Sequence, residues 1–280
     1  GTYHSAIIVR AAATGTLAAN ESKILGEVVN LSNTSLNAAY NYWGHATGPE
    51  EGQIKGTGTV VYAPYYTDEG MTDPVLAVFR FDSDAELVGW YKDRTEPATF
   101  TTVSFNGDHR LKHSISESPL PSSEFYQYTG KKLDTPGATY YSIDLYIPAD
   151  WQNSKTVRAG IWATGKDSDD EISLYPIVEF TNNPKDVDGP SLPRFRVWPV
   201  DASVGNWIDI DATITYDSWY TLTMELDTSE NEVTFTVGDN SVTLGANDTV
   251  QLANVILQGH NPLPSGATYD IYWDNLIIKP

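Results

Sequence analysis

Short segments with strand-forming composition follow one another from Val75 to the C-terminus, and no long amphipathic helix interrupts them. Each segment alternates or runs apolar, and Gly, Pro, Asn or Asp bounds it, which is typical of β-strands. The βαβ alternation of a parallel sheet is missing, so this many short strands indicates two antiparallel sheets packed face to face. We therefore predict an all-β sandwich, with strands at residues 75–81, 100–105, 110–116, 139–147, 157–164, 172–180, 194–200, 207–215, 219–226, 232–237, 255–258 and 269–278.

The composition limits the classes of partner. The chain has 280 residues, enough for one large or two modest domains, and its 37 acidic against 17 basic residues give a net charge of −20. Nucleic acid and anionic membranes are excluded as partners, because neutralising their phosphates needs clustered Lys and Arg. No run of about 18 apolar residues occurs, so no membrane span is expected. Since the chain has no cysteine, its stability must come from the core and the sheets.

The N-terminal part, up to about residue 65, is rich in Ala, Asn, Ser, Thr and Val, and its β-prone segments are spaced like the coils of a solenoid. It contains Asn-x-Trp-Gly at residues 41–44, Gly-Pro at 48–49 and a last predicted strand within 58–64. This succession resembles the closing segment of a secreted right-handed parallel β-helix. The resemblance implies that residues 1–72 are terminal coils and a linker, and that residues 73–280 form a separate module. It also implies a larger multidomain protein that is secreted or held at the cell surface.

Three motifs of the second part carry a further resemblance. Phe-Asp at residues 81–82 is followed by Gly-Trp at 89–90, a hairpin is predicted over 218–239, and Tyr-Trp-Asp-Asn stands at 272–275. These motifs resemble those of concanavalin A-like lectin/glucanase jelly rolls, a superfamily of carbohydrate-binding modules, laminarinase-type hydrolases and polysaccharide lyases. The resemblance implies an antiparallel jelly-roll β-sandwich preceded by a short parallel β-helix fragment, with a ligand groove on the concave sheet. It indicates an architecture and leaves the reaction open.

Strand alternation sorts the side chains of the second part onto two faces, because successive residues of a strand point to opposite sides. In several strands one face is apolar, and the other repeats a mixture of Arg, an aromatic ring and a carboxylate. Aromatic rings stack on the apolar face of a pyranose, and planar charged groups hydrogen-bond vicinal hydroxyls. The predicted ligand-binding residues are Asp144, Tyr146, Arg158, Trp162, Tyr175, Glu179, Arg194, Arg196, Trp198 and His260.

The same pattern also has a structural interpretation. In this alternative a loop covers Trp162 and Trp198, and Arg194 forms a buried ion pair with Glu179. The alternation of side chains fits both arrangements equally well, so a groove and a covered face both stay open at this point.

A hydrolase is disfavoured by the spacing of the carboxylates. The resemblance implies a Glu-x-Asp-x-x-Glu strand for such enzymes, and the nearest pair here is Glu171 and Glu179. Eight residues along a strand separate two carboxylates by more than about 25 Å. Glycoside hydrolysis needs them about 5 to 9.5 Å apart, so this strand cannot supply the pair by itself.

A polysaccharide lyase needs a Tyr or His base and an Arg or a cation that neutralises a uronate carboxylate. Tyr175, Arg194, Arg196 and His260 could take these parts. Gln-Gly-His at residues 258–260 resembles the Gln-x-His strand of jelly-roll alginate lyases, but it leads into Asn-Pro and is expected to be a loop. The primary prediction is a non-catalytic extracellular module that binds a polysaccharide or oligosaccharide. The alternatives are a lyase acting on an anionic glycan and a structural surface-layer or adhesin segment.

The resemblance further implies one structural calcium ion between the first and last strands of the sandwich. Asp82, Asp84 and Asp274 occupy matching places, and their hard oxygen atoms are the ligands that calcium requires. A second acidic run at residues 167–171 is expected to be a solvated loop.

Overall fold

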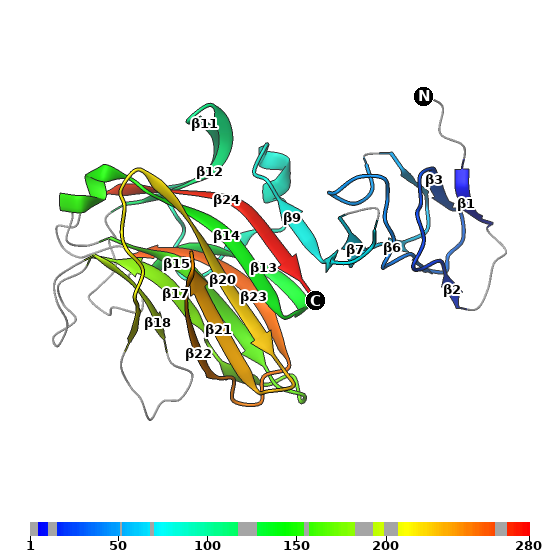
Figure 1. Cartoon of the computed structure of the whole chain (residues 1–280). Helices are drawn as coiled ribbons and strands as arrows, with labels where there is room; N and C mark the ends of the chain where they lie inside the picture. The colour runs from blue at the N-terminus through cyan, green and yellow to red at the C-terminus, as the bar shows by residue number, and fades with distance from the viewer. Residues whose placement is uncertain are drawn as a thin grey trace. The chain divides into compact units, whose positions relative to one another are not determined.

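A computed structural model of the chain divides it into two compact units (Figure 1), one formed by Gly1–Val78 with Ile278–Pro280 and one formed by Phe79–Ile277. The structure describes residues 5–10, 16–50, 52–67, 70–116, 128–153, 157–182, 193–198, 207–260 and 268–280. The predicted boundary at residues 72 and 73 lies a few residues before the observed one. Within the described ranges, no helix has the length and apolar character needed to cross a membrane.

The first unit contains two small parallel sheets whose strands alternate along the chain. One sheet has the order β1 (Ser5–Val9), β3 (Glu27–Asn30) and β5 (Ile54–Gly56), and the other has the order β2 (Leu17–Ala18), β4 (Leu36–Asn37) and β6 (Val60–Val61). Each circuit of the chain therefore adds one strand to both sheets. This arrangement is compatible with a short fragment of a parallel β-helix, and the β-helix itself stays a prediction.

Buried asparagines hold the circuits of the first unit together. The Asn30 side-chain amide donates to the carbonyls of Thr34 (2.9 Å) and Thr59 (2.8 Å), and Asn41 donates to the carbonyl of Ala38 (2.7 Å). Both asparagines are fully buried. Because a buried carbonyl without a partner costs free energy, these side chains stabilise the segments whose carbonyls they bond. An antiparallel pair, β7 (Tyr65–Tyr66) with β8 (Pro74–Val75), also belongs to this unit.

The second unit is a jelly-roll sandwich of two large antiparallel sheets, which confirms the predicted fold class. We call them sheet I and sheet II; Figure 1 shows them as two layers, with β20 and β24 in one and β15 and β23 in the other. Sheet I has the order β11 (Thr99–Phe105), β12 (Asp108–Ile115), β24 (Tyr269–Lys279), β14 (Tyr140–Ile147), β20 (Ser218–Asp227), β21 (Glu232–Val237) and β22 (Asn240–Gly245), with β9 (Ala77–Phe79) paired to β24.

Sheet II supplies the face that the sequence pattern singled out. Its order is β10 (Tyr91–Lys92), β13 (Tyr128–Ala138), β23 (Gln251–His260), β15 (Arg158–Lys166), β17 (Ile177–Thr181), β18 (Arg194–Trp198) and β19 (Ile208–Ile210), with β16 (Ile172–Leu174) paired to β15. Two short 3₁₀ helices, η1 (Asp84–Leu87) and η3 (Ala149–Asn153), accompany the sheets.

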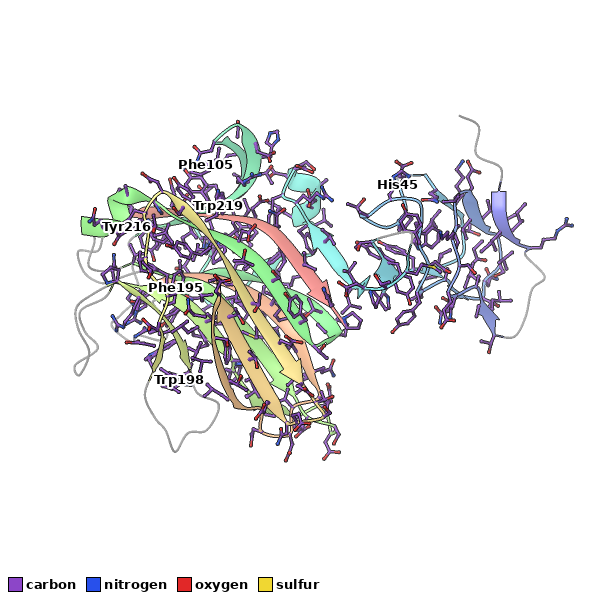
Figure 2. The ribbon with its side chains drawn as sticks, viewed as in Figure 1. His45, Phe105, Phe195, Trp198, Tyr216 and Trp219 are labelled. Carbon is purple, nitrogen blue, oxygen red and sulfur yellow. The ribbon has the colours of Figure 1, made fainter. Side chains whose placement is uncertain are left out.

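The core lies between the inward faces of the two sheets. Ile143 and Leu145 of sheet I and Val178, Phe180 and Phe195 of sheet II are fully excluded from solvent. These are residues that alternation assigns to the apolar side of each strand, so burial of apolar area is the main stabilising contribution here. Figure 2 shows Phe195 among the side chains of this sandwich.

Three local predictions differ from the structure. Strand β13 was not predicted, because its Gly, Lys, Asp and Pro residues are typical of turns. The strand predicted at 207–215 shortens to β19, Ile208–Ile210. The predicted strand at 255–258 continues to His260 in β23, so Gln-Gly-His, expected to lead into a loop, lies in a strand. There β13 pairs with both Gln258 and His260, and β15 pairs with Gln258.

Candidate ligand-binding site

Three neighbouring strands of sheet II bring most of the predicted residues onto one face. In the register of β15, β17 and β18, Glu179 lies opposite Gly160 on one side and Arg196 on the other. In the same way Ile177 lies between Trp162 and Trp198. Because the side-chain period of a strand is two, Arg158 and Arg194 share this face, and the next strand adds the side chains of Gln258 and His260.

An aromatic cavity opens on this face. It has a volume of about 400 Å³, and we call it the aromatic pocket; its lining residues are Arg94, Tyr128, Trp162, Tyr175, Ile177, Trp198 and Trp207. Its walls are ring pairs, with centroids 4.7 Å apart for Tyr128 and Trp162 and 5.1 Å apart for Trp198 and Trp207. Of the predicted residues, Trp162, Tyr175 and Trp198 line the pocket.

The sequence reasoning missed Arg94, Tyr128 and Trp207. Arg94 and Trp207 lie outside the strands whose alternation was analysed, since Arg94 follows β10 and Trp207 precedes β19. Tyr128 is the first residue of the unpredicted strand β13. Trp207 is the first residue of the predicted strand at 207–215, which was the signal available for it. Arg94 lies outside every predicted strand, and periodicity cannot place such a residue on a face.

A buried polar row runs beside the pocket across the same face. The Arg196 guanidinium donates from Nε (2.9 Å) and from a terminal nitrogen (2.7 Å) to Glu179 Oε1, and Gln258 Nε2 donates to Glu179 Oε2 at 2.9 Å. All three side chains are at most 1% exposed. In the structural alternative Arg194 forms the ion pair with Glu179, but in the structure Arg194 pairs with Asp209 (3.2 Å). Burial of an ion pair is therefore observed here, with a different arginine.

Two glycines make room for this row. Gly160 lies between Glu179 and Gln258 in the sheet, and Gly130 lies on the far side of Gln258. A Cβ atom at Gly160 would come within 2.3 Å of the Val178 carbonyl oxygen and 2.4 Å of Glu179 Cβ. Such distances are impossible without a shift of backbone, so the hydrogen bond between Gln258 and Glu179 depends on glycine at this position.

The remaining predicted residues on sheet II contact Tyr128. Arg158 donates to the Tyr128 hydroxyl at 2.9 Å, and the His260 ring lies 5.4 Å from the Tyr128 ring. Burial, followed by the charge of Glu179, raises the pKa of the Tyr128 phenol above its usual value. Tyr128 is therefore a neutral hydrogen-bonding group at ordinary pH.

Asp144 and Tyr146 do not join the pocket. They lie on β14 of sheet I, on the face that points away from the core. Asp144 accepts a hydrogen bond from the Thr221 hydroxyl (2.6 Å), and Tyr146 packs against Phe105 and Trp219 with centroids 5.0 and 5.2 Å away. Figure 2 shows Phe105 and Trp219 near each other and apart from Trp198. The expectation that all ten residues share one trough is therefore wrong for these two.

The predicted calcium ligands do not converge. Asp82 is exposed, and Asp84 accepts a hydrogen bond from the Thr102 N–H at 2.6 Å, which lowers its pKa. Burial raises the pKa of Asp274 to about 6, and its carboxylate lies 3.0 Å from the Arg110 guanidinium. Among the residues that the structure describes, no group of three His, Cys, Asp or Glu could hold a metal ion. These three aspartates therefore do not fit a shared calcium site.

Another cavity, of about 420 Å³, lies in the first unit. Its charged lining residues are already paired, Lys55 with Glu27 (2.5 Å) and His45 with Glu50 (3.2 Å). Trp43 belongs to its lining, but the side chain is fully buried and presents no ring face to a ligand. The aromatic pocket is therefore the better candidate site.

No family model matches this chain, and no curated protein does. Among solved structures, it is similar to a sialidase, with 16% identity over 72% of this chain but only 18% of that one and a TM-score of 0.46. It is also similar to a Bacteroides ovatus GH16 protein of a mixed-linkage glucan locus (11% identity, 73% and 100% of the two chains, TM-score 0.45). An alginate lyase from Chlorella virus gives 13% identity over 73% and 99%, with a TM-score of 0.43. Similarity this low leaves the function to be argued from the chain's own residues.

Proposed function

We propose that the aromatic pocket binds sugar rings of a polysaccharide and that the second unit is a non-catalytic glycan-binding module. The observation that carries the proposal is the enclosure of about 400 Å³ by five aromatic side chains on one face of a jelly-roll sheet. Indole and phenol rings stack on the apolar faces of pyranoses, and few polar groups are needed to orient the sugar. Stacking of this kind gives millimolar to micromolar affinity for an oligosaccharide.

Binding without catalysis is supported by the chemistry of the pocket lining. None of the described lining residues is a carboxylate. Glu179, which lies on the same face, is fully buried, and both its oxygens already accept hydrogen bonds from Arg196 and Gln258. A glycosidase acid or base needs access to the scissile bond, so Glu179 is a poor candidate for that role.

A lyase remains the second candidate because of one specific observation. Gln258 and His260 lie in strand β23, and their side chains face the same side as Arg158. The raised pKa of Tyr128 disfavours it as a phenolate base, which leaves His260 or Tyr175 to remove the proton. A lyase releases unsaturated sugars that absorb in the ultraviolet. A silent assay on alginate, pectate and ulvan would remove this candidate, whereas product release abolished by His260→Ala would replace the binding proposal.

Affinity electrophoresis on a panel of polysaccharides tests the binding proposal. We expect the protein to be retarded on at least one glycan. Trp198→Ala should weaken this by 10-fold or more because it removes a stacking surface, and Trp162→Ala should weaken it too because this indole, only 5% exposed, supports Arg94 and the floor of the pocket. Trp219→Ala on the outward face of sheet I is the matched control and should leave retardation unchanged. No retardation on any glycan, or equal losses for Trp162→Ala and Trp219→Ala, would refute the proposal and favour a structural surface-layer or adhesin segment.

The first unit supports a wider proposal about context. Its paired parallel sheets fit terminal coils of a β-helix at residues 1–72, and we propose that the chain belongs to a larger protein that acts outside the cell. The sequence that precedes residue 1 tests this: further repeats of similar length should continue both sheets.

A further inference from the structure

One charged side chain stands at the aromatic pocket. Among the described lining residues, Arg94 alone carries a formal charge. Its guanidinium carbon lies 4.4 Å from the centroid of the Trp162 ring, and its side chain is only 13% exposed. Stacking on the indole fixes the position of this cation before any ligand arrives.

Other basic side chains lie close to Arg94 and to the wall of the pocket. Asp93 forms an ion pair with Arg94, but the same carboxylate also lies 3.9 Å from the Lys132 ammonium group. Asp134, further along β13, accepts a hydrogen bond from the Tyr91 hydroxyl. Arg158, which donates to the Tyr128 hydroxyl on the pocket wall, is a third cation beside Arg94 and Lys132.

The other arginines of the face are committed to carboxylates. Arg196 pairs with Glu179, and Arg194 pairs with Asp209. Arg94 differs from them because it lines the cavity itself. Burial lowers the pKa of Arg94, so the cation has lost favourable solvation that an incoming anion would restore.

We infer that the pocket takes an acidic sugar and that Arg94 binds its carboxylate or sulfate. This inference rests on the proposed glycan-binding function and names the ligand class of the same site. A ring stacked in the pocket brings its substituents to the guanidinium, a planar group of N–H donors that suits an oxyanion and that already donates from one nitrogen to Asp93. Because Trp162 already holds Arg94 in place, little side-chain entropy is lost on binding.

Two matched pairs of polymers test the ligand class. Polygalacturonate is compared with its methyl ester, and dextran sulfate with dextran, so that each pair differs in charge and little else. We expect the charged member of one pair to bind 10-fold or more tightly than its neutral partner. The pair that shows the difference tells a carboxylate from a sulfate ligand.

Substitutions assign the effect to Arg94. Arg94→Ala should weaken binding of the charged polymer by about 10- to 100-fold, the value of a charge-assisted hydrogen bond, and leave the neutral polymer nearly unchanged. Arg94→Lys should lie between the two, because it keeps the charge and loses the planar fork. Asp93→Asn should strengthen binding of the charged polymer, since it removes the competing carboxylate. Arg80→Ala, an exposed site, is the control for the change in net charge.

Equal binding of charged and neutral polymers, or equal effects of Arg94→Ala and Arg80→Ala, would overturn this inference. If Trp162→Ala abolishes binding in that case, the glycan-binding function stands and only the ligand class is wrong. No retention of any polymer by the unsubstituted protein would overturn both. Should Arg94→Ala fail to fold, Asp93→Asn decides: unchanged affinity for the charged polymers would refute the role of Arg94.

Discussion

The ion pair between Glu179 and Arg196 is the most exacting target for substitution. The Glu179 carboxylate is fully buried and accepts three hydrogen bonds. Glu179→Ala removes it and separates the buried Arg196 guanidinium from this carboxylate. Breaking a buried pair in this way costs about 3–5 kcal/mol of unfolding free energy. For a domain of this size, each kcal/mol of lost unfolding free energy lowers Tm by about 2–4 °C, so Tm should fall by roughly 6–20 °C.

A double substitution separates stability from binding. Glu179→Leu with Arg196→Met replaces both charges by apolar groups, and replacements of this kind usually recover the lost stability. The Arg196 guanidinium also stacks on Trp207, with its carbon 3.8 Å from the ring centroid, and Trp207 is a pocket wall. We therefore expect the double variant to recover the stability lost in Glu179→Ala except for about 1–3 kcal/mol, the cost of the buried Gln258 amide that loses its acceptor, and to bind glycan more weakly.

Urea unfolding followed by tryptophan fluorescence measures the stability of both variants in the full chain, and affinity electrophoresis measures binding. A loss below about 1 kcal/mol for Glu179→Ala would refute the buried-charge argument, because it would mean that water reaches Arg196. A double variant that binds as well as the unsubstituted protein would refute the role of Arg196 in positioning Trp207.

Two further predictions concern single residues of the sandwich. Gly160→Ala should destabilise the protein by about 1–3 kcal/mol and weaken glycan binding, because the added Cβ meets the Val178 carbonyl at 2.3 Å. Gly245→Ala, whose Cβ would meet nothing within 4 Å, should be neutral in the same urea titration, and equal losses at both sites would contradict the packing argument. Burial lowers the pKa of His113 to about 3, so below its unfolded pKa near 6.5 the unfolded state binds a proton that the folded state refuses. Stability should therefore fall as the pH drops below 6.5, with a slope that approaches about 1.4 kcal/mol per pH unit and a loss of about 2.3 kcal/mol between pH 6.5 and 4.5 from this residue alone. The free energy of unfolding of His113→Leu should fall by that much less over this pH range than that of the unsubstituted protein. If the two proteins lose stability in parallel, the histidine is accessible to protons in the folded state.

The fold could be predicted from the sequence because its strands are short and cleanly bounded. Alternation also placed Arg158, Trp162, Glu179, Arg196 and Trp198 on one side of their strands, and the structure brings these residues together on sheet II. This works because the side-chain period of a strand is fixed by backbone geometry and does not depend on which partner the strand finds.

Strand partners could not be predicted in the same way. Asp144 and Tyr146 have the composition of a groove, yet β14 pairs with β20 in sheet I. Membership of a sheet is decided by long-range pairing, and one strand's alternation contains no information about its neighbours. Arg94 was missed for a related reason, since it reaches the pocket from a segment beside the strands, and no period orients such a residue.

The buried charges have a role in the site that stability does not explain. Strands β17 and β18 are buried on both faces along nearly their whole length, so their apolar residues would tolerate a slip of two positions. Such a slip keeps every side chain on its face but would set Glu179 opposite Arg194 or Trp198. It would separate Arg196 from the buried carboxylate with which it now pairs, which costs free energy. The pair thus specifies the one register in which Trp198 lies beside Ile177 and Trp162 lies on its other side. In that register the two indoles face the same cavity. Apolar residues in place of Glu179 and Arg196 could give a more stable core, but it is this charged pair that sets the register on which the aromatic pocket depends.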